Sequence, residues 1–253
     1  MSILDRAAPL PDAVLRYAER GDAVVDVYLP DGPAGSLVVF VHGGFWRSAY
    51  DRRHVRALAT ALAGDGFAVA VPEFRRVGPV GQGGGGGWPT TCDDVRLALD
   101  AIPGLLAGID VVPSRTVLTG HSAGGHLALW LAAVGAGGFD AVVPLAPVGD
   151  LRAAAAIGMG GGAVQAFLGG DPAEVPSSYD AADPAVLLDG HVPDCPVTIL
   201  HGTTDDVVTI ENSRGLVRRH PWIDLLELDG VDHFDLIEPD APAYAEVLAA
   251  FGS

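Results

Sequence analysis

One short stretch of the sequence constrains the fold more than any other, because it predicts a strand, a tight turn and a helix in immediate succession. Residues 115–128 read Arg-Thr-Val-Leu-Thr-Gly-His-Ser-Ala-Gly-Gly-His-Leu-Ala. Residues 116–119 are apolar and β-branched, which predicts a buried strand, whereas residues 123–134 are rich in Ala and Leu, which predicts a helix. The G-x-S-x-G between them would hold the Ser122 hydroxyl outward on a strained turn at a helix N-terminus, where an oxyanion is favoured. A chain with 34 glycines can contain this pattern by chance, but the flanking strand and helix favour a nucleophilic serine.

The rest of the chain predicts an α/β fold. From residue 37 onward apolar strand patterns alternate with helical patterns, which predicts a mostly parallel central sheet with helices on both faces. We expect strands at residues 23–29, 37–41, 67–71, 116–119, 141–145, 197–200 and 225–228, and helices at 51–63, 91–101, 123–134, 210–219 and 243–251. A length of 253 residues fits a single domain over residues 1–253, in which the irregular segment 147–190 holds short helices and forms a short cap or cover over the site.

Composition limits the classes of partner. The formal net charge of −17 opposes binding to nucleic acid or to an anionic membrane. The N-terminus lacks a signal-peptide pattern and no apolar run reaches 18 residues, so we expect a cytoplasmic protein. The only cysteines, Cys92 and Cys195, are far apart and have no zinc-ligand spacing, so we expect no metal and no cofactor. A small molecule is the expected partner, and a homodimer is left open.

A serine hydroxyl is a weak nucleophile and needs a base that is oriented by an acid. Downstream of Ser122, the stretch His-Gly-Thr-Thr-Asp-Asp at residues 201–206 follows a predicted strand, and Val-Asp-His-Phe at 231–234 follows the last one. The order Ser, Asp, His along the chain predicts Ser122 as nucleophile, Asp205 as the acid and His233 as the base. Asp206 is the alternative acid, and otherwise a turn residue.

The other histidines are assigned lesser roles. His42 and His201 follow strands and are expected to brace loops, whereas His54 and His220 look like surface positions. His121 lies beside the serine, and we assign it to substrate binding rather than to proton transfer.

The stretch His-Gly-Gly-Phe-Trp at residues 42–46 follows a buried strand and predicts the second half of an oxyanion hole. Its glycines would let the backbone approach a substrate closely. We expect the backbone amides of Gly44, Phe45 and Ala123 to bind the oxyanion, and Trp46 to line the substrate site beside Phe45.

Glu73-Phe74-Arg75-Arg76 follows another predicted strand. An arginine there could bind a substrate carboxylate, but a structural salt bridge is the more common use of such a pair, and we expect the salt bridge.

Taken together, the H-G-G-F-W of residues 42–46, the G-H-S-A-G-G-H-L-A of 120–128, the H-G-T-T-D-D-V-V of 201–208 and the D-H-F of 232–234 resemble the kynurenine formamidase (arylformamidase) branch of the α/β-hydrolases. Phe45 stands where that branch often has a tyrosine. The resemblance implies an α/β-hydrolase fold and a cofactor-free hydrolysis of N-formyl arylamines such as N-formylkynurenine, which releases formate. The alternatives are a carboxylesterase for short-chain acyl esters and a non-catalytic relative that binds a small molecule.

Overall fold

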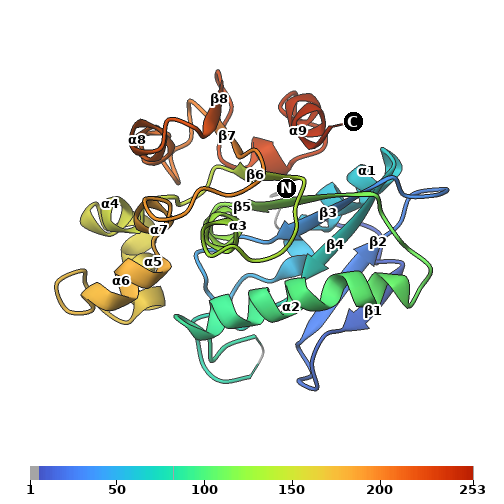
Figure 1. Cartoon of the computed structure of the whole chain (residues 1–253), viewed down its shortest axis with the longest axis horizontal. Helices are drawn as coiled ribbons and strands as arrows, with labels where there is room; N and C mark the ends of the chain where they lie inside the picture. The colour runs from blue at the N-terminus through green and yellow to red at the C-terminus, as the bar shows by residue number, and fades with distance from the viewer. Residues whose placement is uncertain (1–5, 82, 253) are drawn as a thin grey trace.

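The protein is built on one eight-stranded sheet, seen in a computed structural model that describes residues 6–81 and 83–252 (Figure 1). The strands lie in the order β1-β2-β4-β3-β5-β6-β7-β8. Their bounds are β1 Ala13–Arg16, β2 Val24–Tyr28, β3 Ser36–Val41, β4 Phe67–Pro72, β5 Arg115–His121, β6 Ala141–Leu145, β7 Thr198–Gly202 and β8 Asp224–Leu228. β1 and β2 pair antiparallel, and β2 pairs antiparallel with β4, whereas every pairing from β4 to β8 is parallel.

Because six neighbouring strands are parallel, their carboxyl ends meet at one edge of the sheet, which is where open α/β sheets place their sites. His42 follows β3, Glu73 follows β4 and Ser122 follows β5. The loops after β7 and β8 carry Asp205 and His233 to the same edge.

The apolar strands are buried on both faces, as their continuous apolar runs predicted. In β3, Leu37, Val39 and Val41 point into one core, whereas Val38 and Phe40 point into the other. The first core packs against helices α2 (Thr90–Ala107), α3 (Ala123–Ala133) and α8 (Glu211–Arg219). The second packs against α1 (Arg56–Gly64) and α9 (Tyr244–Phe251), so the helices cover both faces of the sheet.

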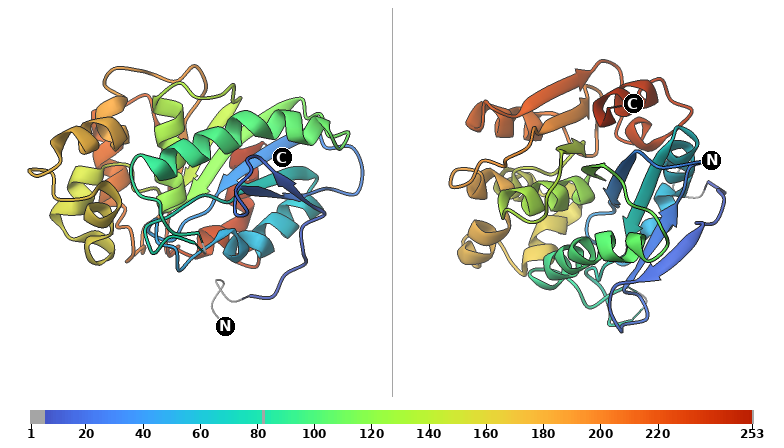
Figure 2. Two further views of the ribbon diagram at one scale, coloured as in Figure 1. Left: turned by 90° about the horizontal axis from the view of Figure 1, so that it is seen from below. Right: turned by 45° about the vertical axis from the view of Figure 1, so that its right-hand side comes forward.

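Four short helices lie between β6 and β7: α4 (Leu151–Ala156), α5 (Met159–Leu168), α6 (Pro176–Ala182) and α7 (Pro184–Leu187). In Figures 1 and 2 they cluster, yellow to orange, at the opposite end of the molecule from the blue β1–β2 hairpin. Two single-turn helices, Arg52–Val55 (η2) and Asp235–Ile237 (η3), complete the described elements. Within residues 6–81 and 83–252, no helix has the length and apolar character needed to cross a bilayer.

The predicted α/β-hydrolase architecture is confirmed, with differences at the ends of elements and at the N-terminal edge. β1 was not predicted, and α2 runs six residues past the expected end at 101, through Pro103, because Ile102 and Leu106 are buried in the core. The segment 147–190, which was expected to hold short helices, contains the four helices α4–α7, which are separated by turns and, around Met159, by four glycines with positive φ.

Candidate active site

Ser122 occupies the strained turn that the motif predicted. β5 ends at His121, α3 begins at Ala123, and Ser122 between them has φ 58° and ψ −119°, a conformation that L residues rarely adopt. The flanking glycines are required by space: a Cβ on Gly120 would lie 2.3 Å from the Gly124 carbonyl oxygen, and one on Gly124 would lie 2.0 Å from that of Val41. The packing of the turn against β3 therefore leaves no room for side chains beside the serine.

Asp205 and His233 form a hydrogen-bonded pair. Nδ1 of His233 lies 2.6 Å from Oδ2 of Asp205, and both side chains are buried. The other oxygen of Asp205 accepts the backbone N–H groups of Val207 and Val208 at 2.9 and 2.8 Å. Burial alone would raise the pKa of Asp205, but the hydrogen bonds from His201, His233 and the Val208 amide outweigh it and hold the pKa well below its usual range. Asp205 is therefore a fixed carboxylate on Nδ1 of His233.

Asp205 and its neighbour Asp206 have different surroundings in the structure. Asp206 is exposed, and the hydrogen bond to Nδ1 of His233 that is expected of the acid is made by Asp205. His201 braces the Asp205 loop, as expected: its Nδ1 lies 2.7 Å from the Ser213 hydroxyl, and its Nε2 lies 2.7 Å from the Val208 carbonyl and 3.3 Å from Asp205 Oδ2.

His121 holds the backbone of His233. Its Nε2 lies 2.9 Å from the His233 carbonyl oxygen, and the two rings are 4.4 Å apart between centroids. Burial, and then the nearby His233, lower the pKa of His121 well below its usual value, so the ring is neutral and its Nε2–H donates to that carbonyl. His121 also lines the cavity that contains Ser122, so its predicted contact with a substrate stays possible.

That cavity is lined by five of the predicted site residues. It has a volume of about 60 Å³ and is lined by Gly44, Phe45, Tyr50, His54, His121, Ser122, Val207, His233 and Phe234. Besides His121 and Ser122, the lining comes from residues 44–54, which include part of the predicted oxyanion loop (residues 42–46), and from the loops that carry Val207 and His233.

The oxyanion loop has an unusual backbone. Gly44, Phe45 and Trp46 have φ of 109°, 53° and 55°. Within the described part of the chain, the amides of Gly44, Phe45 and Ala123 donate to no other group of the protein, which leaves all three N–H groups for a ligand. Ala123 has no partner within α3 because it is the first residue of that helix.

Trp46 differs from its predicted role. Its side chain is 1% exposed, stacks on Phe167 with ring centroids 4.7 Å apart, and packs edge-on against His126 at 5.2 Å. It is not among the residues that line the cavity. The indole of Trp46 is therefore packed in the core, where it anchors the loop instead of forming a substrate wall.

Four lining residues were not predicted: Tyr50, His54, Val207 and Phe234. His54 was expected at the surface but is 8% exposed, and His220 is buried as well, with Nε2 3.0 Å from the Ala185 carbonyl. Phe234 could have been predicted from the sequence, because it directly follows the predicted base, His233. Tyr50 and His54 belong to no recognisable sequence motif, so only the folded structure shows that they line the cavity with Ser122.

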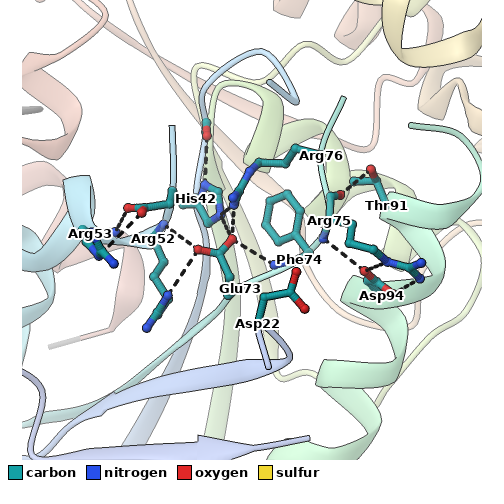
Figure 3. A network of polar contacts seen from close by, with 12 residues as sticks. Asp22, His42, Arg52, Arg53, Glu73, Phe74, Arg75, Arg76, Thr91 and Asp94 are labelled. Carbon is teal, nitrogen blue, oxygen red and sulfur yellow. Dashed lines mark hydrogen bonds and ion pairs between the residues drawn. The ribbon is translucent and has the colours of Figure 1, made fainter. Parts of the chain in front are cut away.

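A buried carboxylate supports the oxyanion loop from behind. Figure 3 shows Glu73, at the end of β4, between His42, Arg52 and Arg76. Its Oε1 lies 3.1 Å from Nε2 of His42 and also contacts Arg76, while its Oε2 lies 3.3 Å from Arg52. The pKa of Glu73 is raised by burial but lowered more by His42 and Arg76, so the net shift is downward.

His42 connects Glu73 to the loop, because its ring contacts both Glu73 and the Gly43 carbonyl. Its Nδ1 donates to the Gly43 carbonyl at 2.9 Å, and its ring stacks on Phe74 with centroids 4.3 Å apart. The expectation that His42 braces a loop and that the arginines make salt bridges is met: Arg76 pairs with Glu73, and Arg75 pairs with Asp94 at 2.7 Å.

Replacing Glu73 by Gln should destabilise the protein by about 3 kcal/mol at pH 7, because Arg76 keeps a buried charge without its partner. The folded-state pKa of Glu73 is depressed, so its ionised form stabilises the fold above the unfolded pKa of about 4.3 and that contribution is lost as the pH falls further. Urea unfolding of wild type and Glu73→Gln at pH 7 and pH 4 measures both effects.

The difference between wild type and Glu73→Gln should therefore shrink at pH 4. Glu246→Gln, at an exposed position on α9, is the matched control and should leave stability unchanged at both pH values. A Glu73→Gln protein as stable as wild type at pH 7 would contradict the role of this carboxylate.

The profile of the BD-FAE family matches residues 25–219, more than three quarters of the chain. No curated protein matches. Among solved structures, a proposed thioesterase from Silicibacter sp. TM1040 is 26% identical, with a TM-score of 0.74 over 99% of this chain and 87% of that one. Esterase B from Lactobacillus rhamnosis, inhibited by a tributyrin phosphonate, is 20% identical, with a TM-score of 0.77 over 96% and 87%.

A truncated carbohydrate esterase from gut microbiota is also 20% identical, with a TM-score of 0.75 over 94% of this chain and 93% of that one. The likeness extends along nearly the whole of each chain, so these proteins share the overall fold. The chain therefore belongs to the BD-FAE family of the α/β-hydrolases.

Proposed function

We propose that this protein is a serine carboxylesterase that hydrolyses esters of short acyl groups. The observation that carries the proposal is the hydrogen bond of 2.6 Å between Asp205 and His233, in a cavity that also contains the strained Ser122. The relatives support the choice of reaction, because two of the three named above are described as esterases and the third as a proposed thioesterase.

The proposed reaction gives each of these groups a role. His233 accepts the proton of the Ser122 hydroxyl as its oxygen attacks the acyl carbon, and Asp205 stabilises the imidazolium that forms. The amides of Gly44, Phe45 and Ala123 bind the oxyanion of the tetrahedral intermediate. His233 then gives its proton to the departing alcohol oxygen. Water, deprotonated by His233, attacks the acyl-enzyme, and the acid leaves as Ser122 recovers its proton.

The cavity supports a short acyl group. We take the small size of the cavity, about 60 Å³, as support for a short acyl group in preference to a long one. The rings of Phe45, Tyr50 and Phe234 border the cavity, and Phe45 in turn packs against the glycine turn of the α4–α5 segment, where a Cβ on Gly160 would lie 2.5 Å from the Phe45 ring. We assign to the segment 147–190 the role of a cover over this side of the site.

The N-formyl arylamines implied by the sequence resemblance are the second candidate. Formyl is the smallest acyl group, and an aryl leaving group could pack on the aromatic rings at the cavity mouth. We place esters first because the named structural relatives are esterases, and because Trp46, half of the predicted aryl wall, lies in the core.

A substrate panel tests the proposal. We expect kcat/KM for p-nitrophenyl acetate or butyrate to exceed that for the octanoate by at least about tenfold, because methylenes that do not fit cost 1–3 kcal/mol each. Free p-nitrophenol is measured by absorbance, and Ser122→Ala provides the background. Preference for the octanoate would exclude a short-acyl site. Faster turnover of N-formylkynurenine than of any ester would replace the esterase assignment by a formamidase.

A further inference from the structure

Arg47 connects the oxyanion loop to the glycine turn at the start of α5, residues 158–162. Its Nη2 donates to the carbonyl oxygen of Gly160 and lies 3.5 Å from that of Gly161. Among residues 6–81 and 83–252, no carboxylate forms an ion pair with Arg47. Its guanidinium therefore serves the glycine turn and not a salt bridge.

The backbone of Arg47 is held on both sides. Its N–H donates to the Gly44 carbonyl at 2.9 Å, and the residue forms a parallel β-bridge with Val77. In that bridge the Val77 N–H donates to the Trp46 carbonyl at 2.7 Å, and the Ser48 N–H donates to the Val77 carbonyl at 2.9 Å. Because its base is fixed, the side chain of Arg47 can hold the glycine turn in one position.

The ring of Phe45 contacts both Arg47 and the glycine turn. Cζ of Arg47 lies over this ring, 5.6 Å from its centroid, which is within the range of a cation–π interaction. A Cβ on Gly160 would lie 2.5 Å from Cε1 of the same ring, so the turn packs directly on it. The guanidinium, the ring and the turn thus form one cluster in which each group touches the other two.

Phe45 needs support from its surroundings because its backbone is strained. Its φ of 53° is left-handed, and a residue with a side chain keeps such a conformation only where the surrounding structure imposes it. The peptide plane before Phe45 carries the N–H that we assign to the oxyanion. A change in φ rotates that plane relative to Cα and the ring. Holding the ring therefore helps to fix the direction of the N–H.

We infer that Arg47 is a positioning residue, which holds the glycine turn against the ring of Phe45 and thereby keeps the Phe45 amide directed at the oxyanion. Arg47 is not among the residues that line the cavity, so it acts through Phe45 and not on the substrate. This inference rests on the proposed esterase function and adds to it a residue from outside the cavity.

Two substitutions separate the charge of Arg47 from its hydrocarbon stem. Arg47→Met keeps most of the length but cannot donate a hydrogen bond or attract the ring. Its kcat for p-nitrophenyl acetate should fall about 10- to 100-fold with KM within about threefold, because losing an oxyanion donor outright costs about 10²–10³ and a misplaced donor loses part of that. Arg47→Lys keeps a charge and a donor, so its kcat should exceed that of Arg47→Met by at least about threefold. Rates are expressed per active site, counted by fluorophosphonate labelling.

Arg152→Met is the matched control. Arg152 also lies over an aromatic ring, with Cζ 5.4 Å from the centroid of Tyr179, and its Nη2 lies 3.4 Å from the Pro176 carbonyl oxygen. These partners belong to the segment 147–190 itself and not to the oxyanion loop. The kcat of Arg152→Met should therefore stay within about threefold of wild type.

A mimic of the tetrahedral intermediate gives a readout that a loss of stability alone would not move. When a trifluoromethyl ketone binds, the Ser122 oxygen adds to its carbonyl carbon, the serine proton passes to His233, and the former carbonyl oxygen becomes the oxyanion. The inhibition constant should rise in Arg47→Met by about the factor by which kcat/KM falls, and should not change in Arg152→Met.

The outcomes distinguish the two proposals. If wild type hydrolyses no p-nitrophenyl ester, the esterase function fails and the inference fails with it. If wild type is active but Arg47→Met keeps its kcat, loses no more than Arg152→Met, or binds the ketone as wild type does, the esterase function stands and the role of Arg47 is overturned.

Gly160→Ala decides the matter if Arg47→Met does not fold. Its added methyl group meets the ring of Phe45 from the side of the turn, so it should lower kcat by at least about tenfold with little change in KM. A wild-type kcat in Gly160→Ala would overturn the inference.

Discussion

Ser122→Ala should lower kcat for the best ester by about 10⁴–10⁶-fold while leaving the fold intact, because the change removes the nucleophile and only one oxygen atom. Among residues 6–81 and 83–252, the Ser122 side chain makes no hydrogen bond that holds the turn together, so we expect an alanine to take its place in the same backbone conformation. The measurement is kcat under saturating ester, together with the thermal midpoint from circular dichroism. More than a tenth of wild-type activity in the purified variant would show that another residue attacks the substrate.

His233→Ala provides the check that the residues act as one unit. Its loss should approach that of Ser122→Ala, and the double variant should be little worse than either single variant, because a serine without its base is as inactive as no serine. Losses that multiply in the double variant would place His233 outside the serine mechanism.

Asp205→Asn should lower kcat by about 10⁴-fold, whereas Asp206→Asn should change it by less than about threefold. Asp205 accepts from Nδ1 of His233 at 2.6 Å and from two backbone amides through its other oxygen. An asparagine whose oxygen stays on those amides turns its NH₂ toward Nδ1, and Nδ1 must then accept. The proton moves to Nε2, so that the base can no longer take the serine proton.

The pair Asp205→Asn and Asp206→Asn is well matched, because the residues are adjacent, the substitution is the same, and one side chain is buried while the other is exposed. Kinetics at pH 7 with the best ester measure the difference. Equal losses at the two positions would mean that loop stability and not the orientation of His233 governs the effect.

The sequence predicted what depends on local pattern and on order along the chain. The apolar runs at 37–41, 67–71 and 141–145 gave their strands nearly to the residue, because buried parallel strands are apolar on both faces. The order Ser122, Asp205, His233 predicted a contact between Asp205 and His233 that lie 28 residues apart.

What the sequence could not predict depends on packing between distant segments. Trp46 was expected in the substrate site because it neighbours the oxyanion glycines, but its indole stacks on Phe167 of α5 and is packed in the core. His54 was expected in solvent because a single histidine carries no periodic signal. The contact of His42 with Glu73 joins the ends of two neighbouring strands, and it appears only once the order of the strands is known.

The central claim is that Ser122 is a nucleophile activated by its surroundings, and covalent labelling tests it most directly. Wild type and Ser122→Ala are incubated with a fluorophosphonate, and the intact proteins and their peptides are weighed by mass spectrometry. We expect one phosphonyl group per wild-type chain, located on the peptide that contains Ser122, and none on Ser122→Ala. An unlabelled wild-type protein, or a label that persists on Ser122→Ala, would contradict it.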